Sequence, residues 1–254
     1  TLSGTSEYVT VDAAVSNDLF YPDHVPLAPA MVKAWAPDGS EAKIENAATG
    51  RYRSTFDVKI DKPGTWVIGT ERSGVSGTFK VDGETWRVGG RRGPPMAAGA
   101  TPPAGAPKSV QTVSEIPANA TEVKLTETAG RNVIFITADA PTMRAYTPTG
   151  KGLEFQPITL PGALASDEEG QFRFLVDGKP AANVEVTVVP GSKKFRETEQ
   201  AQELKTGADG VLRVKWPVAG MYWISASYSD DKPSTPRATE RRLSFTTTLE
   251  VVAP

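Results

Sequence analysis

Along the whole chain there are short stretches in which hydrophobic and polar residues alternate. Residues 52–60 show the two-residue period of a strand that buries one face. Similar stretches, rich in β-branched and aromatic residues, return at 183–189 and 221–228. Gly, Pro, Asp and Asn separate these stretches, as expected of turns. The pattern predicts an all-β protein built from many short strands.

Three local signals refine this prediction. Asp82-Gly83 lies between two strand-like stretches, and this dipeptide favours the tight turn of a β-hairpin. Ala129-Gly130 is expected to turn the chain in the same way. Residues 195–206 carry several Glu and Gln residues and are the only segment in which we expect a helical turn.

The sequence also repeats itself. Gly64 and Trp66 in the first half match Gly220 and Trp223 in the second, each pair following a strand and a proline. Glycine permits a backbone conformation that a Cβ atom penalises, and the large aromatic residue after it is expected to enter a core. Further matched positions are residues 31–39, ending in Pro37-Asp-Gly39, and residues 184–191, ending in Pro190-Gly191.

The repeat predicts two domains. Residues 1–148 are expected to form an N-terminal β-sandwich with a Pro/Ala/Gly-rich loop at 89–107. Residues 149–254 are expected to form an Ig-like, carboxypeptidase-regulatory-like sandwich. The predicted fold class is therefore all-β, with two tandem Ig-like or prealbumin-like β-sandwich domains. Ligands are expected to bind through loops at the domain junction.

Composition excludes several classes of protein. The 254 residues include 28 Lys and Arg and 30 Asp and Glu, and the resulting net charge of −2 argues against a nucleic-acid-binding protein. Because the chain has no cysteine, it has no disulfide, thiolate metal site or cysteine nucleophile. No apolar run approaches the roughly 18 residues of a membrane-spanning helix, so we expect no such helix.

The candidate chemistry centres on the single histidine. Asp18, Asp23 and His24 form the predicted metal site, because carboxylate and imidazole groups suit a divalent ion such as Ni²⁺, Co²⁺ or Fe²⁺. The alternative is a proline-rich surface loop with ordinary polar residues. One histidine and no Gly-x-Ser-x-Gly motif leave no basis for a Ser-His-Asp triad. We therefore assign no catalytic or cofactor-binding residue and expect the protein not to be an enzyme.

The five tryptophans fit either core packing or a sugar-binding face. Four of them lie within predicted strands or next to turn residues, and these are expected to be core residues. Trp86, on the predicted hairpin and beside Arg87, is the one expected to be exposed.

Several segments carry a resemblance to a known family. Residues 176–191, Ala208-Asp-Gly and Trp216-Pro-Val-Ala-Gly-Met-Tyr resemble a bacterial domain-of-unknown-function family that is often labelled as a periplasmic component of cobalt or nickel uptake. Residues 9–20 and 45–57 look like the first half of the same family, so the resemblance covers nearly the whole chain. More loosely, the second half is similar to carboxypeptidase-regulatory and prealbumin-like sandwiches.

The resemblance implies a periplasmic protein, with its signal peptide removed before Thr1, that works alongside TonB-dependent receptors. The implied function is that of a non-catalytic accessory protein in nickel, cobalt or iron-complex acquisition. Its partners would be a metal complex and an outer-membrane receptor or another envelope protein. The alternative is a structural or adhesion-type module that binds protein or glycan, and a hydrolase ranks third.

Overall fold

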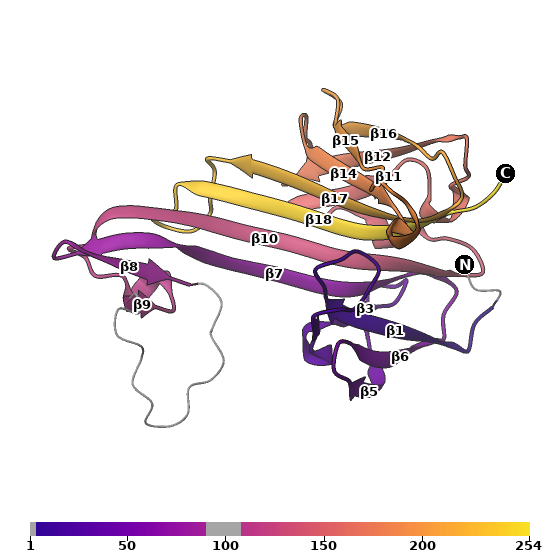
Figure 1. The fold of residues 1–254 in the computed structure, drawn as a ribbon, viewed down its shortest axis with the longest axis horizontal. Coiled ribbons are helices and arrows are strands. Elements are labelled where there is room, and N and C mark those ends of the chain that lie inside the picture. Colours follow the sequence, from indigo (N-terminus) through magenta and orange to yellow (C-terminus); the bar gives the residue numbers. More distant parts are fainter. Residues whose placement is uncertain (1–3, 90–107) are drawn as a thin grey trace. The chain divides into compact units, whose positions relative to one another are not determined.

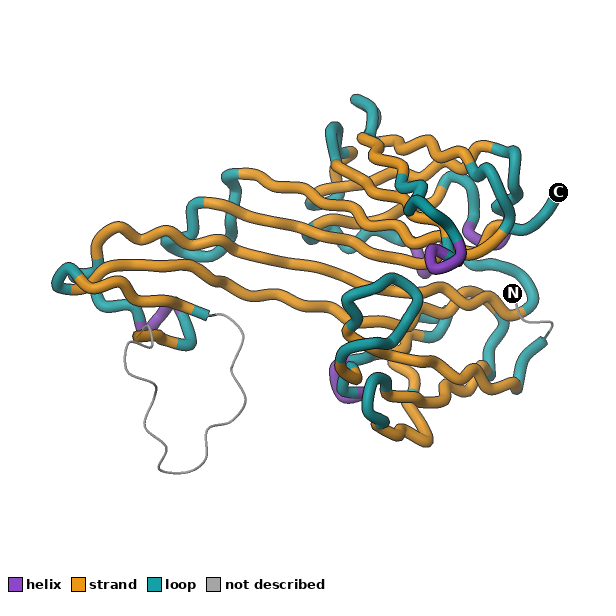
Figure 2. The backbone as a smooth tube through the Cα atoms, in the orientation of Figure 1, coloured by secondary structure: helices purple, strands orange, loops and turns teal. Residues whose placement is uncertain are grey.

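The computed structural model describes residues 4–89 and 108–254 and confirms an all-β protein (Figure 1). Within these residues the helical segments are short 3₁₀ turns, and none is long and apolar enough to cross a membrane (Figure 2). The loop predicted at 89–107 lies, from residue 90 onward, outside the described residues.

The elements follow the chain in this order. The first half contains β1 (Glu7–Val15), β2 (Val25–Pro26), η1 (Pro29–Met31), β3 (Lys33–Trp35), β4 (Glu41–Ala42), β5 (Ile44–Thr49), β6 (Ser54–Ile60), β7 (Gly64–Val81), β8 (Glu84–Val88), β9 (Lys108–Val110), η2 (Val113–Glu115) and β10 (Thr121–Ala138). The second half contains η3 (Met143–Tyr146), β11 (Leu153–Pro157), η4 (Pro161–Ala163), β12 (Glu169–Val176), β13 (Lys179–Pro180), β14 (Glu185–Pro190), η5 (Lys193–Phe195), β15 (Gln202–Lys205), β16 (Val211–Lys215), β17 (Gly220–Asp230) and β18 (Glu240–Val251).

Internal contacts divide the chain into two compact units. The first comprises Thr1–Glu71, Gly130–Ser227 and Ser244–Pro254, and the second comprises Arg72–Ala129 and Tyr228–Leu243. The boundaries fall within β7, β10, β17 and β18. Residues 148 and 149 lie in the loop between η3 and β11, inside the first unit. The division into two domains at this position stays a prediction.

One large sheet runs through the first unit, in the strand order β15-β14-β17-β18-β10-β7-β3-β4. A small sheet of β2, β1, β6 and β5 belongs to the first half of the sequence, and another of β11, β12, β13 and β16 belongs to the second half. The strands β4-β3-β7-β10 thus repeat as β15-β14-β17-β18, and the two sets meet at β10 and β18. We call each set of four strands, together with the small sheet from the same half of the sequence, a half-sandwich.

The core of the N-terminal half-sandwich confirms the predicted alternation from Ser54 to Ile60, whereas Tyr52, predicted to lie on the same face, precedes β6 and is exposed. Phe56, Val58 and Ile60 on β6 are at most 1% exposed and pack with Trp66 and Ile68 on β7. Because every second side chain of β6 points inward, the strand buries one complete face. In the C-terminal half-sandwich, Val211, Leu212 and Val214 on β16 are buried in the same way.

The repeat is confirmed, but its predicted register is wrong by one residue. Trp66 and Tyr222 each follow a positive-φ glycine by two positions, and both side chains are buried. Trp66 Nε1 donates to the Lys62 carbonyl at 3.0 Å, and Tyr222 Oη donates to the Val218 carbonyl at 2.8 Å. Trp223, the predicted counterpart of Trp66, is partly exposed, because a one-residue shift turns a strand side chain to the opposite face.

The same one-residue shift applies to β3. Ala34 lies opposite Ile68, just as Val188 lies opposite Ile224. Ala34 is therefore the counterpart of Val188, and both are fully buried. Trp35, which the sequence comparison matched with Val188, instead points to the other face of the large sheet and is only partly buried.

We expect Tyr222→Phe to lower the free energy of unfolding by about 1 kcal/mol, because it removes the hydroxyl that donates to the Val218 carbonyl and accepts the Val218 backbone N–H at this partly buried corner. Chemical denaturation of the two proteins measures the difference. Tyr8→Phe is the matched control, because Tyr8 is 55% exposed. Equal losses in both variants would contradict a structural role for the corner.

Two local predictions are wrong. Residues 129 and 130 form no turn, because β10 continues through them as one strand. A Cβ atom at Gly130 would lie 2.4 Å from Ser244 Oγ, so this glycine permits the close approach of a neighbouring strand. Residues 195–206 do not form a helical turn: η5 ends at Phe195, and β15 pairs with β14 as an antiparallel strand.

The second unit contains the confirmed hairpin between β7 and β8. Asp82 and Gly83 have φ values of 50° and 81°, as a two-residue hairpin turn requires. Trp86 on β8 stacks on Phe79, with ring centroids 6.1 Å apart, and its Nε1 atom is buried. The prediction that Trp86 is exposed is therefore wrong, because a small core that includes Leu125 packs against it.

A buried ion pair joins β17 to β18 in the second unit. Arg241 Nε donates to Asp230 Oδ1 at 2.9 Å, and Arg241 Nη2 donates to Asp230 Oδ2 at 2.6 Å. The Arg241 side chain is 9% exposed and that of Asp230 is 11% exposed. This two-bond geometry holds both charges in a site that water scarcely reaches.

Candidate functional site

The structure does not gather the predicted metal ligands into a site. Asp18 forms an ion pair with Lys193 at 3.4 Å, and His24 is exposed. Asp23 accepts the Asn17 backbone N–H at 2.9 Å, and this hydrogen bond lowers the pKa of the Asp23 carboxyl. Across residues 4–89 and 108–254, no three His, Cys, Asp or Glu side chains are placed to hold a metal ion. The metal site at Asp18, Asp23 and His24 stays a prediction without support from the geometry.

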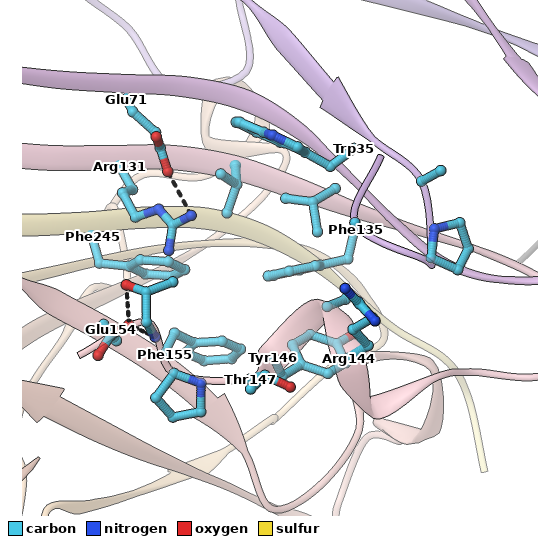
Figure 3. A pocket seen from close by; sticks show the side chains of 18 residues that line it. Trp35, Glu71, Arg131, Phe135, Arg144, Tyr146, Thr147, Glu154, Phe155 and Phe245 are labelled. Atoms are coloured by element: carbon cyan, nitrogen blue, oxygen red, sulfur yellow. Dashed lines mark hydrogen bonds and ion pairs between the residues drawn. The ribbon is translucent and has the colours of Figure 1, made fainter. Parts of the chain in front are cut away.

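A different site lies in the first unit, between the turn that joins β3 to β4, strands β7 and β10, and residues 144–149 (Figure 3). It is a cavity of about 240 Å³. We call it the aromatic pocket, because its walls include the rings of Trp35, Phe135, Tyr146, Phe155 and Phe245. Residues 144–149 belong to the junction at which the sequence analysis expected ligand-binding loops.

The rings form a connected wall. Phe155 stacks on Phe245 with centroids 5.2 Å apart and an interplanar angle of 7°, and it lies 6.0 Å from Phe135. The Phe135 and Tyr146 centroids are 4.9 Å apart. Such spacings are typical of favourable aromatic pairs. Tyr146, Phe155 and Phe245 are buried, whereas Trp35 and Phe135 are partly exposed, so the wall offers an apolar lining made of differently tilted rings.

Two reciprocal hydrogen bonds fix the segment that carries Tyr146 and Arg144. The Thr65 backbone N–H donates to Thr142 Oγ1 at 3.0 Å, and the Thr142 backbone N–H donates to Thr65 Oγ1 at 3.1 Å. Thr142 directly precedes η3, so these bonds attach η3 to β7. Burial raises the pKa of the Tyr146 phenol well above its usual range, so the phenol is neutral at physiological pH.

Three of the four charged groups that line the pocket are compensated. Arg131 Nη2 lies 2.5 Å from Glu71 Oε1. The buried Glu154 carboxylate accepts the Thr149 backbone N–H at 2.5 Å, the Thr149 hydroxyl at 2.8 Å and the Gly150 backbone N–H at 3.1 Å. These bonds hold the junction loop against β11.

Arg144 is the fourth charged group, and it is exposed. Its guanidinium forms no ion pair or hydrogen bond with any residue that the structure describes. It lies against the β3–β4 turn at Gly39, where a Cβ atom would come within 3.2 Å of Arg144 Nε and Nη2. The pocket thus combines an aromatic wall with one uncompensated positive charge (Figure 3).

Sequence reasoning identified none of the pocket's charged residues. Arg131 follows the Gly130 that was expected to lie in a turn, and Arg144 lies in a segment predicted only as a connection. The pocket draws on segments as distant as residues 35 and 245, so no local motif marks it. Trp35 carried no signal either, because the sequence comparison matched it with Val188 and placed it in the core.

A family model described as a domain of unknown function, DUF4198, matches residues 1–230. The chain belongs to the DUF4198 family. This confirms the domain-of-unknown-function part of the resemblance, whereas the DUF4198 description names no activity, ligand or location.

Two further comparisons add nothing to the functional assignment of this DUF4198 protein. Among curated proteins, none matches the chain. The match with a solved structure titled "D0-D1 domain of Intimin" covers 98% of the DUF4198 chain and 94% of the solved chain, with 13% sequence identity and a TM-score of 0.21. A score this low carries no argument, so the fold rests on the sheets described above.

Proposed function

We propose that this DUF4198 protein is a non-catalytic periplasmic accessory protein of metal acquisition, and that it binds an anionic metal complex in the aromatic pocket. The observation that supports this most is the aromatic wall beside the guanidinium of Arg144, which has no partner among the described residues. Small-molecule sites combine apolar walls with a few placed polar groups. Because drug-sized sites measure roughly 300–1,000 Å³, a cavity of about 240 Å³ suits a small ligand.

The charges of the pocket favour a metal complex over a bare ion. A bare cation needs several oxygen or nitrogen ligands from the protein, but Glu71 is paired with Arg131, and Glu154 is bonded to its own loop. A nickel, cobalt or iron chelate brings its own ligands and carries surplus negative charge. Arg144 would attract that charge, and the rings would contact the organic part.

The periplasmic location and the receptor partner rest on the family resemblance. One surface feature supports a protein partner: Phe195 is 83% exposed on the loop after β14. Arg196 fixes this loop by donating to the Pro190 carbonyl at 2.8 Å and to the Glu199 carbonyl at 3.1 Å. An aromatic side chain held outward by a fixed loop is typical of interface anchors.

The alternative function, a glycan-binding or adhesion module, is favoured by a different surface. Trp223 is partly exposed and lines a hollow on β14, β15 and β17 together with Thr187, Ser225 and Glu203. An indole beside hydroxyl and carboxylate groups suits a sugar ring, because the ring stacks while the polar groups bond its hydroxyls. Loss of oligosaccharide binding in Trp223→Ala, with normal binding in Arg144→Met, would support this alternative.

Calorimetric titration tests the leading proposal. We expect the citrate complexes of Fe³⁺, Ni²⁺ and Co²⁺ to bind and the bare Ni²⁺ and Co²⁺ ions not to bind. Arg144→Met should weaken binding at least about 10-fold, the effect of losing one charge-assisted hydrogen bond. His24→Ala should leave binding unchanged. Binding of bare ions that His24→Ala abolishes would instead support the loop site and contradict the pocket.

A further inference from the structure

We infer that Arg144 recognises a carboxylate, and that the group attached to this carboxylate is a planar aromatic ring. This inference deepens the proposed function and rests on the same pocket. The inference identifies the part of the ligand that the protein recognises. This part would be present both in the free acid and in its metal chelate.

The charge of the ligand follows from the balance within the pocket. Glu71 and Arg131 neutralise each other at 2.5 Å, and the carboxylate of Glu154 is saturated by three donors from its own loop. The guanidinium of Arg144 is left without a partner among the described residues. A guanidinium presents parallel N–H groups whose spacing matches the two oxygens of a carboxylate. The pocket is therefore suited to a ligand that carries an anionic group.

The shape of the ligand follows from the wall. Phe135, Tyr146 and Phe155 lie with successive centroids 4.9 and 6.0 Å apart, and Trp35 also lines the cavity. Trp35 and Phe135 are the partly exposed rings, and an aromatic ligand can pair with either of them face to face or edge to face. Each such pair contributes about 0.5–1.5 kcal/mol beyond burial. A tetrahedral anion such as phosphate gains nothing from the rings, so we expect it to bind more weakly than an aromatic acid.

The turn between β3 and β4 sets the position of Arg144. Gly39 has a φ of +83°, and its missing Cβ leaves room for Nε and Nη2 of Arg144. This places the guanidinium beside the pocket opening, while its exposure leaves it accessible to a ligand. Arg144 is thus a specificity-determining residue that depends on a glycine of another segment for its place.

The test is calorimetry and thermal-shift measurement at low ionic strength with benzoate, benzamide, cyclohexanecarboxylate and inorganic phosphate. We expect benzoate to bind more tightly than each of the other three. Benzamide has the same ring without the charge, so its affinity should be about 10- to 100-fold lower. Arg144→Met should remove this preference for benzoate over benzamide, and Arg144→Lys should recover only part of it because lysine lacks the paired N–H groups.

Arg51→Met is the matched control, since Arg51 is also an exposed arginine of the first unit but lies outside the pocket. It should bind benzoate like the unmodified protein. Because the Arg144 guanidinium is exposed and pairs with none of the described residues, Arg144→Met should keep its melting temperature without ligand, which separates a binding defect from misfolding. Equal affinity for benzoate and benzamide, or unchanged benzoate binding by Arg144→Met, overturns the inference.

The outcomes also separate the inference from the proposed function. If metal citrate complexes bind but benzoate neither binds nor competes with them, the aromatic-acid inference fails and the metal-complex proposal stands. If benzoate binds through Arg144 and no metal complex does, the inference stands and the metal-complex proposal fails. If neither class binds, both are wrong.

Discussion

Asp230→Ala is expected to lower the free energy of unfolding by about 3–5 kcal/mol, because it leaves the buried guanidinium of Arg241 without its carboxylate. Both side chains are about nine-tenths buried, so water cannot replace the lost partner. Urea denaturation measures the loss. Glu84→Ala is the control, because the pair of Glu84 and Lys108 in the same unit is exposed, and we expect little measurable change from breaking it.

The same pair makes stability depend on pH. Hydrogen bonding from Arg241 lowers the pKa of Asp230 in the folded protein, compared with about 3.9 in an unfolded chain. A carboxyl group with a lowered folded pKa contributes stability that is fully present above its unfolded pKa and is lost as the pH falls through its folded pKa. The unmodified protein should therefore lose part of its stability below about pH 4. Asp230→Asn should not show this loss of stability at low pH. Identical profiles of stability against pH for the two proteins would contradict the role assigned to Asp230.

Phe155→Ala is expected to cost about 3–5 kcal/mol of unfolding free energy, the usual loss when a buried phenylalanine is truncated. Phe155 contacts four other rings, those of Phe135, Phe172, Phe174 and Phe245. It also belongs to the wall of the aromatic pocket, so the variant should lose benzoate binding at temperatures where it remains folded. Calorimetry and thermal denaturation measure the two effects.

Phe195→Ala provides the comparison for the same substitution at the surface. Phe195 is 83% exposed, so its removal creates no cavity and should leave the melting temperature and benzoate binding unchanged. A loss of stability in Phe195→Ala similar to that in Phe155→Ala would show that the packing described here does not determine stability.

The fold could be predicted from the sequence where the signal is local. The two-residue period and the Asp82-Gly83 turn each depend on neighbouring residues, and the structure confirms the period over residues 54–60 and the turn. The register of the repeat was wrong because two aromatic residues, Tyr222 and Trp223, follow Gly220. Only the facing strand decides which of the two points inward.

Predictions failed where a distant strand determines the role of a residue. Gly130 reads as a turn residue from its neighbours, but its small size is needed for the approach of Ser244, more than a hundred positions later. The aromatic pocket was missed for the same reason. Its arginines acquire a role only in the folded chain, where Arg131 pairs with Glu71 and Arg144 pairs with no carboxylate in residues 4–89 and 108–254.

The meeting of the two half-sandwiches at β10 and β18 has a consequence for any shortened form of the protein. Each of these strands is the last of its set, and each covers the open hydrogen-bonding edge of the other. A polypeptide that stopped after β10 would carry that row of unpaired N–H and C=O groups into solution. Because the sets repeat one another, the best-matched cover for the bare edge would come from a second identical molecule, so such a shortened form is expected to self-associate.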